Sequence, residues 1–465
     1  MLHRVLVANR GEIAARILRT CQRLGIETVL AASEADLDSV PARLADRVIC
    51  LGPAPPSASY LNVGAVVGAA VSTRSDAIHP GYGFLSENPS LARACEAAGL
   101  VFIGPGAAQL EAAGDKLAAR EQATAAGLPV LAGGEARDAG AAESLAREIG
   151  WPVLIKAAGG GGGRGLRPVH GPGDLARAAG HAMAEAQAAF GDSRIYLERF
   201  MTAARHVEVQ LLGDGQRVIH LGDRDCSIQR RYQKVIEEAP APHLDPGLRR
   251  AMHQAATAFG TRLRYRGLGT VEFLVDGASG TFYFLEMNAR IQVEHPVTEA
   301  VCGLDLVAEQ IAVAEGRPLR LAQEDVTLAG HAIECRLNAE DRLGVPSPGT
   351  VTRAVFPAGP GIRVDGWVQA GSVVPPFYDS LLAKLIVCGA DRAEAAGRLR
   401  RALDTCEITG LATNLPLHRE LARAPEFVAG GVPTDFLARF LDGAAGRAET
   451  AGAPRGGSAT GTAHG

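Results

Sequence analysis

The chain has 465 residues, 47% of them hydrophobic and 21% charged, with a formal net charge of −4 at pH 7, so it is long enough for two or three domains with complete cores. The small negative charge gives no reason to expect a nucleic-acid or anionic-membrane partner. The longest apolar run (63–71) is too short to span a bilayer. The opening MLHRVLVANRGE lacks the apolar core of a secretory signal. Eight cysteines without any CxxC spacing argue against a disulfide framework or a zinc site, and they favour a reducing cytoplasm.

Short strands alternate with helices through the first 114 residues. Strands are predicted at 4–8, 27–32, 47–51, 77–83 (with the loop that ends it) and 101–105, and helices at 11–24, 60–71 and 88–99. This alternation predicts a parallel, doubly wound sheet. The first strand-to-helix turn, Asn9-Arg10-Gly11, has no GxGxxG, so the unit is Rossmann-like without a dinucleotide-binding fingerprint. The segment HPGYGFLSEN (79–88) follows a strand, where α/β sheets place their sites, although a plain turn is the alternative.

A run of five glycines, Gly159 to Gly163, follows the strand predicted at 153–157. It is not a Walker A loop, because no Lys-Ser/Thr follows it, and a formal GxGxxG inside polyglycine carries no information. Its backbone N–H groups could fold down over phosphates, with Lys156 at the end of the preceding strand. A flexible linker is the alternative, but it fits poorly between two strong strands. The block from about residue 115 through the strand predicted at 205–212 has the look of a small mobile subdomain.

Two predicted strands, 269–276 and 281–288, are joined by the turn-rich GASG and indicate a β-hairpin. With the turn near Ser279, Glu272 faces Glu286 across the pair, with Cβ atoms ~5 Å apart. Two ionised carboxylates in this position repel each other unless a cation lies between them. Together with Asn288 they are hard oxygen donors, which Mg²⁺ prefers where it also holds phosphates. The hairpin therefore predicts a magnesium–nucleotide site.

Polar and apolar residues alternate over residues 286–294, which read EMNARIQVE. A period of two predicts a single extended strand whose polar face continues beyond the metal site. The polar positions are Glu286, Asn288, Arg290, Gln292 and Glu294. The alternative is an amphipathic strand with that face in water.

Only four lysines (116, 156, 234 and 384) stand against 43 arginines. Because arginine cannot replace a compact ammonium group aimed at a phosphate or another anion, these lysines are candidates for such roles. Lys234 lies in the densely charged segment 217–243, for which a solvated, self-compensating surface is the alternative. With Arg290 and Gln292 it could hold a small anion, and Glu294 is then the natural base for the proton of that anion.

A further α+β block begins with HAIECRLNAE (331–340) and contains a helix predicted at 391–404. Arg336 in its first strand, taken alone, is better explained by a structural ion pair than by catalysis. The tail, 443–465, is rich in Gly, Ala, Ser and Thr without apolar periodicity and is expected to be disordered. The whole chain is predicted to be a multidomain protein of α/β and α+β class.

Six segments in order resemble those of the biotin carboxylases, members of the ATP-grasp family. They are NRGEIAARI, HPGYGFLSEN, GGGGGRG, RDCSIQRRYQKVIEEAPAP, EMNARIQVEHPVTE and HAIECRLNAED. The resemblance runs from residue 1 to about 440 and implies a Rossmann-like pre-ATP-grasp domain, an ATP-grasp domain with a mobile lid, and an α+β carboxy-terminal domain. The expected boundaries are 1–114, 115–330 with the lid at about 131–203, and 331–442, followed by the tail.

The resemblance also implies roles for individual residues. The matching ATP contacts are Lys116, Lys156, Gly162, Gly163, Glu198, Arg199, Phe200, Met201 and His206. The matching ligands of Mg²⁺ or Mn²⁺, with two ions expected, are Glu272, Glu286 and Asn288. The matching bicarbonate site is Lys234, Arg290, Gln292 and Val293, with Glu294 as general base and Arg336 as the group that steadies the biotin enolate. Tyr232 departs from the histidine or asparagine that the family commonly has there in contact with nucleotide, and we expect its hydroxyl to substitute. Lys384 falls in a family-like segment without an implied role.

The implied reaction is the ATP- and bicarbonate-dependent carboxylation of biotin through carboxyphosphate, the first half-reaction of acetyl-CoA carboxylase in fatty acid synthesis. Biotinylation needs a lysine flanked by methionines, and no lysine here has a methionine neighbour. We therefore expect a separate biotin carboxyl carrier protein, a separate carboxyltransferase and a cytoplasmic homodimer. The final acceptor, whether acetyl-CoA, another acyl-CoA or pyruvate, is left open.

Two other functions are weighed against this one. One is a different ATP-grasp ligase that acts through an acyl phosphate, such as half of a carbamoyl-phosphate synthetase. The other is a catalytically silent nucleotide-binding regulatory subunit, which would lack one or more reactive residues. All of these residues are present: Glu272, Glu286, Arg290, Glu294 and Arg336.

Overall fold

The computed structural model describes residues 1–157, 166–190, 193–277 and 279–443. Gly162 and Gly163, which were expected to contact ATP, and the tail after residue 443 therefore lie outside the described residues. Within those ranges, no helix has the length and apolar character needed to cross a membrane. All eight cysteines are free thiols, as their spacing predicted.

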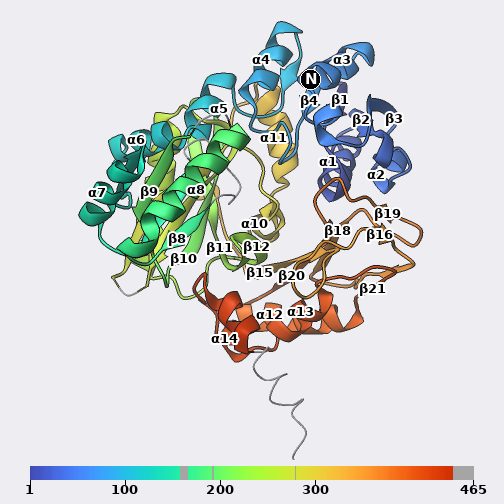
Figure 1. The fold of residues 1–465 in the computed structure, drawn as a ribbon. Coiled ribbons are helices and arrows are strands. Elements are labelled where there is room, and N and C mark those ends of the chain that lie inside the picture. The colour runs from blue at the N-terminus through green and yellow to red at the C-terminus, as the bar shows by residue number, and fades with distance from the viewer. Residues whose placement is uncertain (158–165, 191–192, 278, 444–465) are drawn as a thin grey trace, which may run out of the picture.

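The amino-terminal block is a five-stranded parallel sheet of order β3-β2-β1-β4-β5, which confirms the predicted doubly wound unit (Figure 1). Its strands are β1 (Arg4–Val7), β2 (Glu27–Ser33), β3 (Arg47–Gly52), β4 (Ala77–His79) and β5 (Val101–Phe102), and its helices are α1 (Gly11–Arg23), α2 (Val40–Leu44), α3 (Val63–Ser72), α4 (Pro89–Ala97) and α5 (Ala107–Gly114). The carboxyl ends of β1 and β4 meet where the strand order reverses. There Nδ2 of Asn9 donates to the carbonyl oxygens of Pro80 and Tyr82, at 2.7 Å each. Open α/β sheets bind ligands at this switch point.

A small antiparallel sheet, of order β6-β9-β7-β8, forms a second unit with its own core. Its strands are β6 (Gly133–Ala136), β7 (Val153–Ala157), β8 (Arg167–Val169) and β9 (Ile195–Arg199), and its helices are α7 (Ala139–Ile149) and α8 (Pro172–Phe190). Helix α6 (Lys116–Ala125) precedes it. Its buried apolar cluster draws only on residues 136–197, so this unit packs mainly on itself.

An eight-stranded antiparallel sheet joins the rest of the chain, in the order β14-β13-β10-β11-β12-β15-β20-β18. Its strands are β10 (Arg205–Asp214), β11 (Val218–Arg230), β12 (Gln233–Ala239), β13 (Arg266–Asp276), β14 (Thr281–Asn288), β15 (His331–Asn338), β18 (Ile362–Gly366) and β20 (Leu381–Gly389). Because β12 pairs with β15, the sheet is continuous across residue 330, where sequence suggested a division.

Helices cover both faces of this sheet, as Figure 1 shows for α12 and α13 below β15 and β20. The helices are α9 (Pro246–Arg262), α10 (His295–Cys302), α11 (Leu306–Ala314), α12 (Arg392–Thr405), α13 (Leu415–Leu421) and α14 (Pro425–Ala429), and short 3₁₀ turns span Glu34–Asp36, Pro56–Ala58 and Gln323–Asp325. Two small ladders pair β16 (Gly349–Thr350) with β19 (Val373–Val374), and β17 (Arg353–Val355) with β21 (Glu407–Thr409). In β15 the apolar residues Ile333, Cys335 and Leu337 join the core with α12, so Glu334 and Arg336 face the opposite side, toward α10.

The predicted hairpin is confirmed, with Glu272 directly opposite Glu286 in the β13–β14 ladder. The predicted strand over 286–294 is wrong beyond Asn288, where β14 ends. Residues 289–294 form an irregular turn, and Glu294 occupies the N-cap position of α10. The backbone of this turn bonds to side chains instead of to a neighbouring strand: the Ala289 N–H donates to Glu87, and the Val293 carbonyl accepts from Lys384.

Candidate active site

Lys234 on β12 lies at the centre of three buried carboxylates. Its Nζ is 2.6 Å from Oε2 of Glu208, 2.9 Å from Oε1 of Glu272 and 2.7 Å from Oε1 of Glu294. The side chain of Lys234 is 12% exposed, against 0% for Glu208 and Glu294. The alternative of a solvated charged surface for residues 217–243 is therefore wrong at this point. A compact ammonium group satisfies three convergent carboxylates here, which a planar guanidinium group is poorly shaped to do.

The strand ladders explain why these groups converge. Glu208 on β10 is in register with Glu272 on β13 and with Arg224 on β11, so all three side chains point to one face. The fully buried Arg224 donates to Oε1 of Glu208 at 2.6 Å. Sequence reasoning missed both Glu208 and Arg224. The alternation of RHVEVQLL carried a signal for Glu208, because it puts His206, Glu208 and Gln210 on one face of the strand and most of the apolar residues on the other.

The state of Glu294 follows from its partners. Burial by itself would raise the pKa of this carboxyl group, but Lys234, Arg336 and Arg224 together hold the pKa well below its usual value. Nη2 of Arg336 lies 3.0 Å from Oε2 of Glu294. Glu294 is therefore an ionised carboxylate, fixed between two cations and shielded from solvent.

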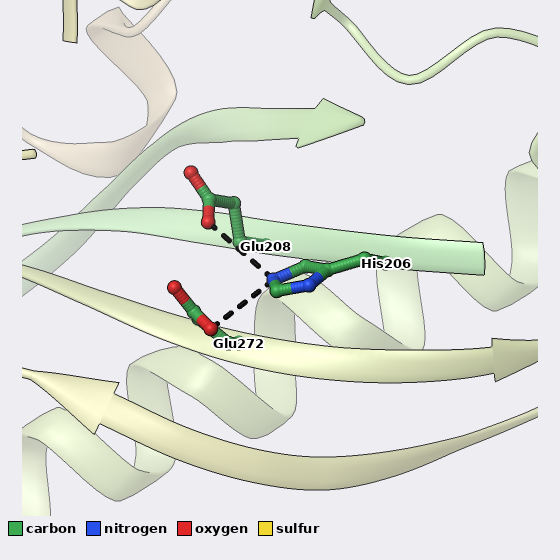
Figure 2. Close-up of side chains that lie close together, drawn as sticks. All are labelled: His206, Glu208 and Glu272. Atoms are coloured by element: carbon green, nitrogen blue, oxygen red, sulfur yellow. Dashed lines mark ion pairs between the residues drawn. The ribbon is translucent and has the colours of Figure 1, made fainter. Parts of the chain in front are cut away.

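His206 lies beside the carboxylates of Glu208 and Glu272, as Figure 2 shows. Its Nε2 lies 3.1 Å from Oε2 of Glu272 and 3.8 Å from Oε2 of Glu208. Burial lowers the pKa of His206, but the carboxylate of Glu272 reverses this effect, so the pKa is raised overall. The ligand atoms of these three residues lie close enough together to hold a metal ion.

The predicted metal ligands share one end of the hairpin. Glu272 and Glu286 are opposite each other, and Nδ2 of Asn288 donates to Oε1 of Glu272 at 3.0 Å. Oxygen donors from three side chains in this arrangement suit a hard divalent cation such as Mg²⁺. The residues present therefore fit the ion that the resemblance implied.

The turn after β14 directs Arg290 and Gln292 toward this group. Nη2 of Arg290 donates to Oδ1 of Asn288 at 2.9 Å, and Nε2 of Gln292 lies 3.3 Å from Oε1 of Glu272. Nε of Arg290 also donates to Glu87 at 3.0 Å. Glu87 belongs to the segment 79–88, so that segment is more than a plain turn: it holds the turn that carries Arg290.

Arg336 combines the two interpretations considered for it. Its Nε donates to Oε1 of Glu237 at 2.6 Å, which is a structural ion pair, and its Nη2 reaches Glu294 at 3.0 Å. Its strand, β15, pairs with β12, which carries Lys234. Continuity of the sheet thus brings residues 234, 294 and 336 into one cluster.

The remaining predicted residues are distributed differently. Lys156 on β7 and Glu198 on β9 lie in the small four-stranded sheet and form an ion pair of 2.6 Å, and Arg199, Phe200 and Met201 follow in the chain. Lys116 is the first residue of α6. Tyr232 is 42% exposed in the tight turn between β11 and β12, where it and Arg231 both have positive φ. The structure therefore brings together the residues predicted for the metal, the anion and the base, while Lys156 and Glu198 belong to another unit.

Glu237 and Glu334 face each other in the β12–β15 ladder, and both are fully buried. One Glu237 oxygen and both Glu334 oxygens have no hydrogen-bond partner among the described residues. Burial, with a smaller contribution from Glu294, raises the pKa of Glu237 to about 7 against the opposing effect of Arg336. Burial also raises the pKa of Glu334 well above its usual value, although Lys384 opposes it. The pair therefore retains a proton near neutral pH.

Replacing Glu334 with glutamine is expected to stabilise the protein increasingly as the pH rises. Above the usual glutamate pKa of about 4.3, the unfolded wild-type chain releases a proton that folded Glu334 keeps, so its free energy of unfolding falls by about 1.4 kcal/mol per pH unit until the folded pKa is reached. The variant lacks this term. Urea unfolding of both proteins at about pH 5, 6 and 7 should show a growing difference, and a constant difference would contradict the assignment.

Comparison with known proteins finds matches along most of the chain. Family models match residues 1–110 (biotin carboxylase, N-terminal domain), 115–322 (carbamoyl-phosphate synthase L chain, ATP binding domain) and 334–439 (biotin carboxylase C-terminal domain). A biotin carboxylase of Pseudomonas aeruginosa is 50% identical over 446 residues, covering 95% of this chain and 99% of the relative. A pyruvate carboxylase subunit of Methanothermobacter thermautotrophicus is 46% identical, covering 95% of this chain and 91% of the relative.

Among solved structures, the biotin carboxylase domain dimer of a Hydrogenobacter thermophilus 2-oxoglutarate carboxylase, in complex with MgADP, ADP and bicarbonate, superimposes with a TM-score of 0.92. It shares 44% identity, covering 95% of this chain and 98% of that chain. The fold and the matched models define a three-domain ATP-grasp ligase. The chain belongs to the biotin carboxylase family.

Proposed function

We propose that this protein is the biotin carboxylase subunit of an acetyl-CoA carboxylase, which carboxylates biotin on a separate carrier protein with ATP and bicarbonate. The observation that carries the proposal is the buried, ionised carboxylate of Glu294 between Lys234 and Arg336. A base for bicarbonate must be ionised and close to cations that bind the anion. The same cations lower the pKa of bound bicarbonate, so a carboxylate of low pKa still serves as its proton acceptor.

The chemistry then proceeds in four steps. Glu294 removes the proton of bicarbonate held by Lys234, Arg290, Gln292 and Val293. An oxygen of the resulting carbonate attacks the γ-phosphorus of ATP, and the bond to ADP breaks, giving carboxyphosphate. Carboxyphosphate splits into CO₂ and phosphate, and the phosphate takes the N1 proton of biotin. Arg336, with Arg290, stabilises the enolate, whose N1 attacks CO₂.

We assign Glu272, Glu286 and Asn288 to hold Mg²⁺ or Mn²⁺, in two sites. When bound, the ions would neutralise phosphate charge. The hairpin supports this assignment, because its register puts the two glutamates opposite each other and the side chain of Asn288 contacts Glu272. His206 and Glu208 lie next to Glu272 and extend the same acidic group.

We assign ATP to the space between the small four-stranded sheet and the metal ligands. The proposed contacts are Lys116, Lys156, Gly162, Gly163, Glu198, Arg199, Phe200, Met201, His206 and the hydroxyl of Tyr232. A small unit with its own core is suited to act as a lid over nucleotide. This assigns residues 1–114 to the pre-ATP-grasp domain, 115–330 to the ATP-grasp domain with its lid at about 131–203, and 331–442 to the carboxy-terminal domain.

The proposed partners are a biotin carboxyl carrier protein, a carboxyltransferase and a second copy of the chain, in the cytoplasm. Eight free thiols are compatible with a reducing compartment. A second candidate function is a component of another biotin-dependent carboxylase that acts on a different acyl-CoA or on pyruvate. The similarity to part of a pyruvate carboxylase favours keeping this candidate.

Two experiments test the proposal. We expect the purified chain to hydrolyse ATP in a bicarbonate-dependent reaction that becomes faster when free biotin is added, because biotin consumes the CO₂ of carboxyphosphate. Unchanged hydrolysis on addition of biotin would instead favour another ATP-grasp ligase. Affinity purification of the native complex, followed by identification of the co-eluting carboxyltransferase, decides between acetyl-CoA and the other acceptors.

A further inference from the structure

Lys384 is a completely buried lysine next to the base but outside the reacting group. Its side chain is 0% exposed, and its Nζ donates to the carbonyl oxygen of Val293 at 2.8 Å. That carbonyl belongs to the peptide unit that joins Val293 to Glu294. Lys384 therefore contacts the backbone of the base directly, without touching its carboxylate.

Lys384 and Arg336 act on the same residue from neighbouring strands. They are direct partners in the β15–β20 ladder, so both side chains point to the face that carries α10. Arg336 holds the side chain of Glu294 at 3.0 Å, and Lys384 holds the peptide that precedes it. The two cations thus restrain the carboxylate and the backbone of one residue.

The ammonium group is itself anchored from the amino-terminal block. Oε2 of Glu12, on α1, lies 3.1 Å from Nζ of Lys384, and Oε1 of Glu12 accepts a short hydrogen bond from the hydroxyl of Tyr82. Glu12 is buried, and Tyr82 lies in the loop after β4, at the switch point of the parallel sheet. The Nζ atom of Lys384, on β20 of the carboxy-terminal block, therefore contacts both the amino-terminal block and the turn at residues 289–294.

The turn at residues 289–294 needs such a restraint, because it is not part of a strand ladder. The carbonyl of Gln292 is bonded locally, to Nδ1 of His295 at the start of α10, at 2.8 Å. The next carbonyl, that of Val293, is bonded by Lys384 from a distant element, β20. Loss of that bond would leave the peptide before Glu294 free to rotate. A buried carbonyl without a partner is also costly.

We propose that Lys384 is a positioning residue of the carboxylation reaction, which fixes the Val293–Glu294 peptide so that the Glu294 carboxylate stays between Lys234 and Arg336. The inference rests on the proposed function of Glu294 as the base. It also explains why lysine stands here in a chain rich in arginine. One carbonyl oxygen and one carboxylate oxygen accept two of the three donors of an ammonium group in this closed space, whereas a guanidinium group would bring five donors.

The test compares Lys384→Met with the double variant Lys384→Met/Glu12→Gln. The single change leaves Glu12 buried beside an apolar side chain, which destabilises the fold, while the double variant removes both charges and is expected to fold. For the double variant we expect bicarbonate-dependent kcat to fall by about 10²-fold, the loss that a ~1 Å misplacement produces, with the KM for ATP unchanged. Glu12→Gln alone keeps the ammonium group but weakens its anchor, so a smaller loss is expected.

Arg392→Met is the matched control. Arg392, on α12, forms a buried ion pair of 2.7 Å with Glu238, on β12. Glu238 follows Glu237 in the chain and makes no ion pair with the turn at residues 289–294 among the described residues. The Arg392→Met variant should have a lower unfolding temperature but an unchanged kcat. Wild-type kcat in the double variant, or an equal loss of kcat in the control, would overturn the positioning role of Lys384 but not the proposed function of the protein. Absence of bicarbonate-dependent ATP cleavage in the wild-type chain would overturn the proposed function, and this inference with it.

Discussion

Replacing Glu294 with glutamine is expected to reduce bicarbonate-dependent ATP cleavage by about 10²–10⁴-fold, the usual contribution of a positioned general base. The amide keeps the shape of the side chain but cannot accept the bicarbonate proton. Because the proposed nucleotide contacts Lys156 and Glu198 lie in a separate sheet, the KM for ATP should stay close to that of the wild type. Steady-state kinetics with varied bicarbonate and ATP measure both effects.

Glu238→Gln is the matched control for this change. Glu238 is also buried and paired with two basic side chains, His331 at 2.8 Å and Arg392 at 2.7 Å, but it does not contact Lys234. We expect this variant to lose stability while its turnover stays near the wild-type value. Full turnover in the Glu294 variant, or an equal loss in both variants, would exclude Glu294 as the base.

Replacing Lys234 with methionine is expected to lower the free energy of unfolding by about 3–5 kcal/mol, the cost of removing one partner from a buried ion pair. Three carboxylates lose their common cation, and anion binding should be lost with it. Urea unfolding measures the stability, and the bicarbonate-dependent assay measures the turnover. Lys234→Arg restores the charge, so it should recover part of the stability, but not the turnover, since its planar group cannot reproduce the three contacts.

The destabilisation of this methionine variant should depend on pH. In the wild type, Lys234 helps to hold the pKa values of Glu272 and Glu294 below their usual value, although burial raises both. A depressed folded pKa contributes stability that is present above the unfolded pKa of about 4.3 and is lost as the pH falls through the folded pKa. The difference between wild type and variant should therefore be fully present at neutral pH and shrink as the pH falls below about 4.3. A difference that is independent of pH would show that the lost energy is not electrostatic.

The sequence predicted several local features correctly. The alternation of strands and helices in the first 114 residues predicted the parallel sheet, and the turn near Ser279 predicted the pairing of Glu272 with Glu286. The scarcity of lysine drew attention to Lys234 and Lys384, both of which are buried among polar partners. These features depend on residues close together in the chain or on composition.

The period-two pattern of residues 286–294 led to a wrong prediction beyond Asn288. Alternation shows only that successive side chains lie in an apolar and a polar environment, and a turn that packs between a core and a polar site also produces it. The apolar Ala289 and Ile291 lie in the core, as in a strand. The polar Gln292 and Glu294 are buried as well, where Gln292 contacts Glu272 and Glu294 contacts Lys234 and Arg336. The strand ends at Asn288, since the backbone that follows bonds to Glu87 and Lys384, from segments far away in the chain.

By itself, the sequence determined the doubly wound unit and the opposed glutamates, and its resemblance to a family supplied the set of reactive residues that we propose. Only the tertiary structure decided that β12 pairs with β15, which puts Arg336 beside Glu294. It also decided that Glu208, paired with Arg224, contacts Lys234, and that Lys384 holds the peptide before Glu294. The physical reason is that a buried charge is stable only with partners, and these partners come from distant segments. The separation along the chain is 60 residues for Lys234–Glu294, 42 for Arg336–Glu294 and 91 for Lys384–Val293.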